Sequence, residues 1–237
     1  MSIAGAITAA VVVGIGVLSG LALMPEIRRQ RREWAKWAQA RGWHHLAESR
    51  GVFGGLRAQP FGRGLAHASN IISGTWDGLP FTMYHYTRHT GVGKSSRTIT
   101  ATVAQFAGDA DFPTLVVYRG ELLNGSRDIN FESAEFNRTY DVRCADERFA
   151  YQVVHPRFMH ALMNSPLRDA NFTLERGVVT VWMKDHVMRE RGTQPPQALA
   201  ELVRLIPRHV WADHGGTPPE LNDDGPTPAV VPPLPKV

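Results

Sequence analysis

The stretch Asn70-Ile-Ile-Ser-Gly-Thr-Trp-Asp-Gly-Leu-Pro-Phe-Thr-Met-Tyr-His-Tyr86 decides the fold of this chain. Its centre is Asp77-Gly78, a dipeptide that readily adopts the positive φ angles of a two-residue hairpin turn. On both sides of this turn, β-branched and aromatic residues alternate with polar ones, which is typical of strands. The sequence therefore predicts two antiparallel strands, 70–76 and 79–86.

Further strands and helices are predicted on the C-terminal side of this hairpin. Strands are expected over 98–106, 115–118, 139–144 and, around a turn at Arg176-Gly177, over 172–175 and 178–187. Helices are expected from Asp146 as N-cap to about Val154, from Pro156 onward, and over 197–206. Residues 44–69 show little periodicity and indicate irregular structure. Strands and helices do not alternate regularly, so we predict an α+β domain over 43–212, an antiparallel sheet with helices packed on it.

The N-terminal segment 1–24 is predicted to be a transmembrane helix. Residues 2–24 contain no charged side chain, and a helix of this length, about 35 Å, can cross a hydrocarbon core of about 30 Å. A cleaved signal peptide is the alternative, but no basic residue precedes the apolar run. Gly16 and Gly20 form a GxxxG pattern, which permits a homodimer through this helix.

A basic juxtamembrane helix is predicted over 25–42. Its six Lys and Arg residues against two Glu account for the whole formal net charge of +4. By the positive-inside rule the N-terminus lies outside and the C-terminal domain in the cytoplasm, in a single-pass membrane protein. We expect inner-leaflet lipid as a partner, with the tryptophans at the headgroup level; packing of the tryptophans on the domain is an equal alternative. The residues expected to anchor the chain are Arg28, Arg29, Arg31, Arg32, Trp34 and Trp37.

Charge and composition also limit the possible partners and disulfides of this chain. Because the basic excess is confined to 25–42, the globular body is neutral, which argues against nucleic acid as a partner. The single cysteine, Cys144, excludes an intrachain disulfide.

Residues 213–237 are predicted to be a Pro-rich disordered tail. Its end, Val231-Pro-Pro-Leu-Pro-Lys236, has the PxxP shape that aromatic grooves bind; a solvated end is the alternative.

Motifs that carry chemistry are not complete in this sequence. Residues 91–96, Gly-Val-Gly-Lys-Ser-Ser, match only the end of a phosphate-binding loop, because Arg88 stands where the first glycine is required. The ten histidines are scattered without the spacing of metal ligands. We therefore expect neither a cofactor nor a metal. An acid/base pair of carboxylates would require folding to bring two of them together.

The stretch Phe131-Glu-Ser-Ala-Glu-Phe-Asn-Arg138, followed by Tyr140-Asp-Val142 and Pro156-Arg-Phe-Met159, carries a family resemblance. It resembles a family of uncharacterised bacterial membrane-anchored proteins that have an N-terminal hydrophobic segment and an F-x-x-x-F-N-R-like motif. The family also has a hairpin reading roughly G-x-x-x-G-x-P-F, which residues 74–81 match. The resemblance covers about residues 60–210 and implies an architecture, not an activity.

Within this motif, Glu132, Asn137 and Arg138 form a candidate binding site. The alternative is that these three residues tie a turn to neighbouring backbone while Phe131 and Phe136 fill the core. The sequence thus predicts a membrane-tethered, non-enzymatic binding or scaffolding domain with a protein or lipid partner. The competing hypothesis is a membrane-bound hydrolase or other enzyme, with a site assembled around His85, His155 or the carboxylates.

Overall fold

The computed structural model describes residues 25, 28–49, 52, 55–62, 65–91, 96–120, 129–184 and 192–222. The expected transmembrane helix, 1–24, and the PxxP segment lie outside these residues. Within the described part of the chain, the helices are too short or too polar to cross a membrane.

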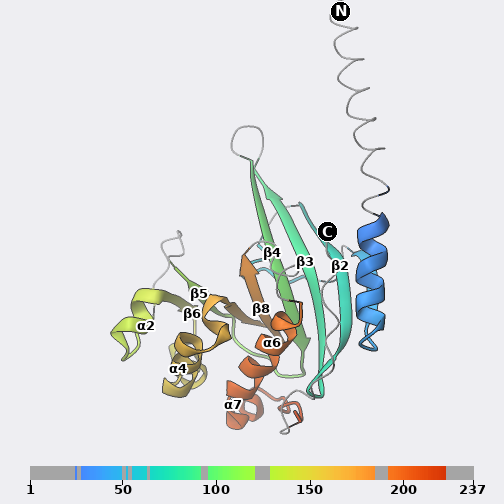
Figure 1. The fold of residues 1–237 in the computed structure, drawn as a ribbon. Coiled ribbons are helices and arrows are strands. Elements are labelled where there is room, and N and C mark those ends of the chain that lie inside the picture. The colour runs from blue at the N-terminus through green and yellow to red at the C-terminus, as the bar shows by residue number, and fades with distance from the viewer. Residues whose placement is uncertain are drawn as a thin grey trace, which may run out of the picture.

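One eight-stranded antiparallel sheet organises the fold, and its long strands β2, β3 and β4 are seen side by side in Figure 1. The strands are β1 (His44–Ser49), β2 (Leu65–Trp76), β3 (Leu79–Thr90), β4 (Arg97–Ala107), β5 (Leu115–Arg119), β6 (Tyr140–Cys144), β7 (Asn171–Glu175) and β8 (Val178–Lys184). Their order is β1-β2-β3-β4-β8-β7-β5-β6, and all the named strand pairs are antiparallel. The predicted α+β class with an antiparallel sheet is therefore confirmed.

The hairpin of β2 and β3 forms where the sequence predicts it but is longer. Asp77 and Gly78 have φ angles of 51° and 81° and connect paired Trp76 and Leu79. The strand β2 begins at Leu65, so the prediction that it begins at Asn70 is wrong. A bulge between Ser69 and Ile72 shifts the register at this point. Since a bulge moves side chains to the other face, the alternation before Asn70 is out of phase with that after it.

Helices cover one face of this sheet. They are α2 (Ala134–Thr139), α3 (Glu147–Val153), α4 (Pro156–Asn164), the 3₁₀ turn η2 (Pro166–Asp169), α6 (Gln194–Leu205) and α7 (Arg208–Asp213). The caps that the sequence predicts are present: the side chain of Asp146 accepts a hydrogen bond from the Phe149 amide, and Pro156 opens α4. In Figure 1, α4, α6 and α7 lie on the same side of the sheet, and α6 packs on β2, β3, β4 and β8.

The opposite face of the sheet is covered by the irregular segment 55–62. The carboxylate of Glu175 on β7 is buried and accepts hydrogen bonds from the backbone amides of Arg57 (3.0 Å) and Ala58 (2.9 Å). Tyr86 on β3 donates to the Phe61 carbonyl at 3.0 Å. These bonds hold Leu56 and Phe61 against a second apolar cluster, which includes Tyr84 and Trp182.

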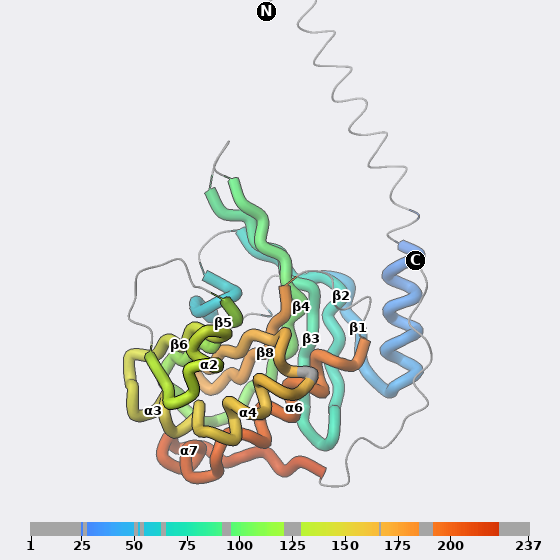
Figure 2. Tube along the Cα trace, turned by 60° about the vertical axis from the view of Figure 1, so that its left-hand side comes forward, coloured from blue at the N-terminus to red at the C-terminus, as the bar shows by residue number. Residues whose placement is uncertain are grey.

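Residues 28–39 are helical and lie alongside β1 at the edge of the sheet, as Figure 2 shows. Trp34 and Trp37 are only 7% and 4% exposed. Their rings, 5.5 Å apart, continue through Trp43 to Phe81 on β3, with centroid distances of 5.5 and 5.0 Å. The tryptophans thus pack on the domain, which decides between the two alternatives left open by the sequence, and their indoles do not face headgroups.

The basic residues of this helix divide into two groups. Arg28, Arg29 and Arg32 are exposed on the side away from the tryptophans. Arg31 forms an ion pair with Glu48 on β1, and Arg29 pairs with Glu33 on the helix itself at 3.2 Å. A helix beside an edge strand also protects that strand from pairing with other chains. The strand β1, absent from the prediction for residues 44–69, is this covered edge.

The C-terminal end of the described chain is also attached to the domain. Disorder is expected from residue 213, yet the amide of Thr217 donates to Asp109 at 2.9 Å and the amide of Asn222 donates to the Asp77 carbonyl at 2.9 Å. Residues 213–222 therefore follow the surface of the domain up to the β2–β3 turn.

Trp37→Ala should destabilise the full chain in detergent micelles by about 3 to 5 kcal/mol, because it removes a buried indole from the middle of the ring series. Chemical denaturation measures this loss. The matched control is Lys36→Ala, whose side chain is exposed on the same helix and which should stay within about 0.5 kcal/mol of the wild type. Equal effects of the two changes would mean that the helix is not part of the core.

Candidate functional site

A groove of about 590 Å³ lies between residues 130–132, the end of α3 and the start of α4. This volume is in the range of small-molecule and peptide sites. The groove brings together the Phe131–Arg138 motif and the Pro156–Met159 motif, which are separated in the sequence. Its lining residues are Asn130, Phe131, Glu132, Tyr151, Val154, His155, Pro156 and Met159.

Asn137 holds one wall of the groove in place. Its side-chain oxygen accepts a hydrogen bond from the Phe131 amide at 2.9 Å, and its side-chain nitrogen donates to the Phe131 carbonyl at 2.7 Å. Ser133 caps α2 by accepting from the Phe136 amide at 3.2 Å. Asn137 therefore ties the turn, as the structural alternative for this motif predicts.

The other two residues of the motif have different surroundings. Glu132 is exposed at the groove, and no hydrogen bond or ion pair joins its carboxylate to another described residue. Arg138 is exposed and does not line the groove. The structure thus places only Glu132 of these three side chains where a ligand in the groove could contact it, while Asn137 acts on the wall from behind.

Aromatic rings form the apolar part of the groove. Phe131 meets Tyr151 edge to face at 5.2 Å, and Phe131 also contacts the fully buried Phe136 at 5.6 Å. Tyr151 is 49% exposed, which is unusual for a large aromatic side chain of this domain. Its hydroxyl donates to the Asn130 carbonyl at 3.3 Å. The ring is therefore oriented by the protein and leaves one face open to solvent.

His155 lines the groove but serves as a helix cap. Its Nδ1 accepts a hydrogen bond from the Phe158 amide at 3.4 Å, and its Nε2 lies 3.0 Å from the Leu205 carbonyl. Because a carbonyl can only accept, Nε2 carries the proton and Nδ1 is the acceptor. Both nitrogens are occupied, so His155 has no free lone pair with which to act as a general base.

The other groups required by the enzyme hypothesis do not join His155. His85 lies on β3 and does not line the groove. Glu132 is the one carboxylate in the lining, so the groove holds no acid/base pair. Over the described residues, no three His, Cys, Asp or Glu side chains are arranged to hold a metal ion. Cys144 is half-buried, and burial raises the pKa of its thiol, which disfavours the nucleophilic thiolate.

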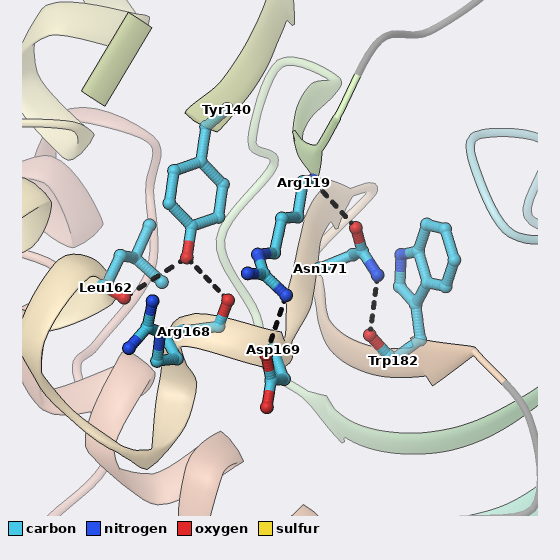
Figure 3. Close-up of polar contacts among 7 residues, drawn as sticks. All are labelled: Arg119, Tyr140, Leu162, Arg168, Asp169, Asn171 and Trp182. Carbon is cyan, nitrogen blue, oxygen red and sulfur yellow. Dashed lines mark hydrogen bonds and ion pairs between the residues drawn. The ribbon is translucent and has the colours of Figure 1, made fainter. Parts of the chain in front are cut away.

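A second polar cluster lies behind the groove, around Tyr140 on β6 (Figure 3). The Tyr140 hydroxyl is within 2.9 Å of the Arg168 carbonyl and 3.1 Å of the Leu162 carbonyl. Burial raises the pKa of Tyr140 to about 12, and the nearby Arg119 partly opposes this shift. Tyr140 is therefore a neutral hydrogen-bond donor at ordinary pH, and its ring stacks on Phe136 at 5.1 Å.

Arg119 connects this cluster to the sheet. Its guanidinium pairs with Asp169 of η2 at 2.7 Å, and its amide donates to the Asn171 side chain at 2.9 Å, as Figure 3 shows. Asn171 in turn donates to the Trp182 carbonyl at 3.2 Å. The ion pair and these two hydrogen bonds join η2 to β5, β7 and β8. The sequence gives no signal for this cluster, because Arg119 and Asp169 are 50 residues apart.

The comparisons with known proteins bear on the fold. The chain matches no protein-family model and no curated protein sequence. Among solved structures it is similar to the crystal structure of the mycobacterial trehalose monomycolate transport factor A, TtfA, with a TM-score of 0.53 and 17% sequence identity. The match covers 76% of this chain and 97% of that chain. At this identity the likeness shows a shared fold.

Asn137→Ala should destabilise the protein by about 2 kcal/mol, because it removes both hydrogen bonds to Phe131. Hydrogen exchange at the Phe131 amide should accelerate correspondingly. The neighbouring Arg138→Ala is the matched control and should change neither quantity measurably. If Arg138→Ala had the larger effect, the assignment of the turn to Asn137 would be wrong.

The raised pKa of Tyr140 predicts a loss of stability at alkaline pH. The unfolded chain ionises this phenol near pH 10 and the folded chain only near pH 12, so the stabilisation is complete below pH 10 and is lost as the pH rises toward 12. Its size is on the order of 2 kcal/mol. The free energy of unfolding of Tyr140→Phe should therefore fall less steeply over this window. Parallel curves for the two proteins would contradict the assignment, because Tyr84 and Tyr86 titrate in both.

Proposed function

We propose that this chain is a membrane-tethered, non-enzymatic binding domain that serves a transport assembly in the membrane. The observation that carries the proposal is the groove between α3 and α4. Tyr151 is 49% exposed in this groove, beside the apolar side chains of Phe131 and Pro156, while His155 and Asn137 use their polar groups to hold the walls. Exposed aromatic residues beside apolar neighbours are typical of binding surfaces.

The arrangement of polar groups favours binding over catalysis. A catalytic site needs a proton donor or acceptor within reach of the reacting atom. In the groove, both nitrogens of the one histidine, His155, are hydrogen-bonded to backbone groups, and the one carboxylate, Glu132, has no second carboxylate beside it in the lining. A ligand in this groove would be held by apolar contacts and by a single negative charge.

The membrane tether is supported by the sequence. Residues 1–24 have the length and apolarity of a membrane span, and we infer that they place the domain in the cytoplasm with the basic flank inside. Arg28, Arg29 and Arg32 are exposed next to that span and suit anionic lipid of the inner leaflet. Because Trp34 and Trp37 fix the helix on the sheet, the exposed arginines of the helix keep a fixed position relative to the groove.

The link to transport comes from the fold. The similar solved structure is that of a mycobacterial trehalose monomycolate transport factor, a protein named for transport. An accessory role of this kind requires a binding surface held at the membrane and no reaction of its own. The tethered groove of this chain meets both requirements, with a membrane transport protein as the partner.

A site-specific cross-linking experiment tests this function. A photoreactive residue replaces Tyr151 in the full chain in its native membrane, and the matched control carries the same residue at Leu65, which is 82% exposed and does not line the groove. We expect an integral membrane transport protein to cross-link from position 151 and not from position 65. Deletion of residues 1–24 should abolish this product, because the domain is no longer concentrated at the membrane.

Two outcomes would contradict the proposal. Equal products from both positions would show that the groove is not the binding surface. Products that consist only of soluble proteins, or that persist without residues 1–24, would remove the membrane assembly from the function.

A further inference from the structure

We propose that the C-terminal segment Val231–Lys236 of this same chain occupies the groove between α3 and α4 and competes there with the partner. The inference rests on the proposed function only in treating this groove as a binding surface. It names an occupant, and with it a regulation, that the groove alone does not specify. Three independent features support it: the chemistry of the walls, the charge at the rim and the position at which the tail leaves the domain.

The walls of the groove suit a proline-rich segment. Tyr151 and Pro156 are exposed in the groove, and the largely buried side chains of Phe131 and Met159 also line it. Proline-rich segments bind such aromatic grooves because they already populate the extended polyproline II form and lose little entropy on binding. The segment Val-Pro-Pro-Leu-Pro-Lys supplies three proline rings and one leucine over residues 231–236.

The walls of the groove are preorganised by hydrogen bonds within the protein. Asn137 fixes both backbone groups of Phe131, the hydroxyl of Tyr151 is bound to the Asn130 carbonyl, and His155 caps α4. Walls held in this way do not need to be ordered on binding, which lowers the cost of association.

The charge at the rim matches the end of the tail. The Glu132 carboxylate is exposed at the groove and has no ionic partner among the described residues. Lys236 directly follows the last proline of the segment. When the prolines of the segment lie against the aromatic rings of the groove, the ammonium group of Lys236 reaches the side that carries the Glu132 carboxylate.

The tail leaves the domain close to the groove. The side chain of Arg204 on α6 donates at 3.1 Å to the carbonyl of Asn222, the last described residue. The next residue, Leu205, accepts the hydrogen bond of His155 in the groove lining at 3.0 Å. One arginine side chain and two hydrogen bonds therefore connect Asn222 with the groove, which limits their separation to about 20 Å.

The chain is long enough to cover this distance. Nine residues, 223–231, separate Asn222 from the first proline of the segment. At about 3.1 Å per residue they reach about 28 Å even without full extension. A linker of this length gives an effective concentration on the order of 1 mM at the groove, so even a tail with modest affinity would occupy it.

A competition measurement tests the inference. The probe is a fluorescent peptide of residues 229–237, titrated by anisotropy into the full chain in detergent micelles and into the chain that ends at Asn222. This deletion keeps every residue that the structure describes. We expect saturable binding to the shortened chain, and binding about tenfold weaker to the full chain, because its own tail competes at an effective concentration on the order of 1 mM.

Variants assign the binding to the groove. On the shortened chain, Tyr151→Ala should weaken binding of the peptide about tenfold, whereas Leu65→Ala, also at an exposed site, should not change it. Glu132→Lys should weaken the natural peptide, and a peptide carrying Lys236→Glu should recover affinity on that variant. A peptide with alanine at Pro232, Pro233 and Pro235 should bind weakly to all forms.

Three results would overturn the inference: no saturable binding to the shortened chain up to about 5 mM peptide, beyond the effective concentration of the tail; equal affinity for the full and shortened chains; or binding that Tyr151→Ala leaves unchanged. Equal affinity would mean that the groove accepts such peptides from a partner while the tail of this chain does not enter it.

Cross-linking of a membrane transport protein from position 151 is independent of these results. Loss of the peptide signal alone would thus leave the proposed function standing, and loss of the cross-link alone would leave the inference standing.

Discussion

The turn at Asp77-Gly78 holds together three parts of the chain that are distant in sequence. Both residues adopt positive φ angles, which reverses the chain within two residues and presents the Asp77 carboxylate and carbonyl outward. The carboxylate binds Arg204 of α6 at 3.1 Å, and the carbonyl accepts the amide of Asn222 at 2.9 Å. On the strands that leave this turn, Phe81 contacts Trp43 and thereby the helix 28–39. The helical layer, the C-terminal segment and the N-terminal helix are thus all positioned from one hairpin.

Both faces of the sheet are buried, and this explains which elements the sequence could reveal. Elements that begin with a local signal were predictable: Asp77-Gly78 for the hairpin, Asp146 for α3 and Pro156 for α4 each act on their own neighbours in sequence. Elements whose pattern depends on a distant partner were not. Residues 65–69 belong to β2, but the bulge at Asn70 breaks the alternation that would show it. The edge strand β1 carries no strong apolar pattern because the helix 28–39, rather than a third layer, covers it.

The same distinction applies to the candidate site. Asn137 acts on Phe131, six residues away, so the motif itself contains the turn that forms one wall of the groove. The role of His155 could not be predicted, since its partner, the Leu205 carbonyl, is 50 residues away in sequence. Tryptophans at 34 and 37 fit a membrane interface as well as a protein core in sequence, because both surroundings require the same amphipathic helix. Only the observed packing on Trp43 and Phe81 shows that these tryptophans lie in the protein core.

Charged side chains of opposite sign lie at the two ends of the strand order. The exposed arginines of the helix 28–39 lie at the sheet edge next to β1, whereas Glu132 lies in the groove beside β6, at the other end of the strand order. Under the proposed function, the first surface would face anionic lipid and the second would face a cationic peptide. The tryptophan contacts join the helix to the sheet, so lipid at the first surface would leave the groove at the other end of the strand order open. The proposed domain would then act by position, by holding a binding groove beside the membrane.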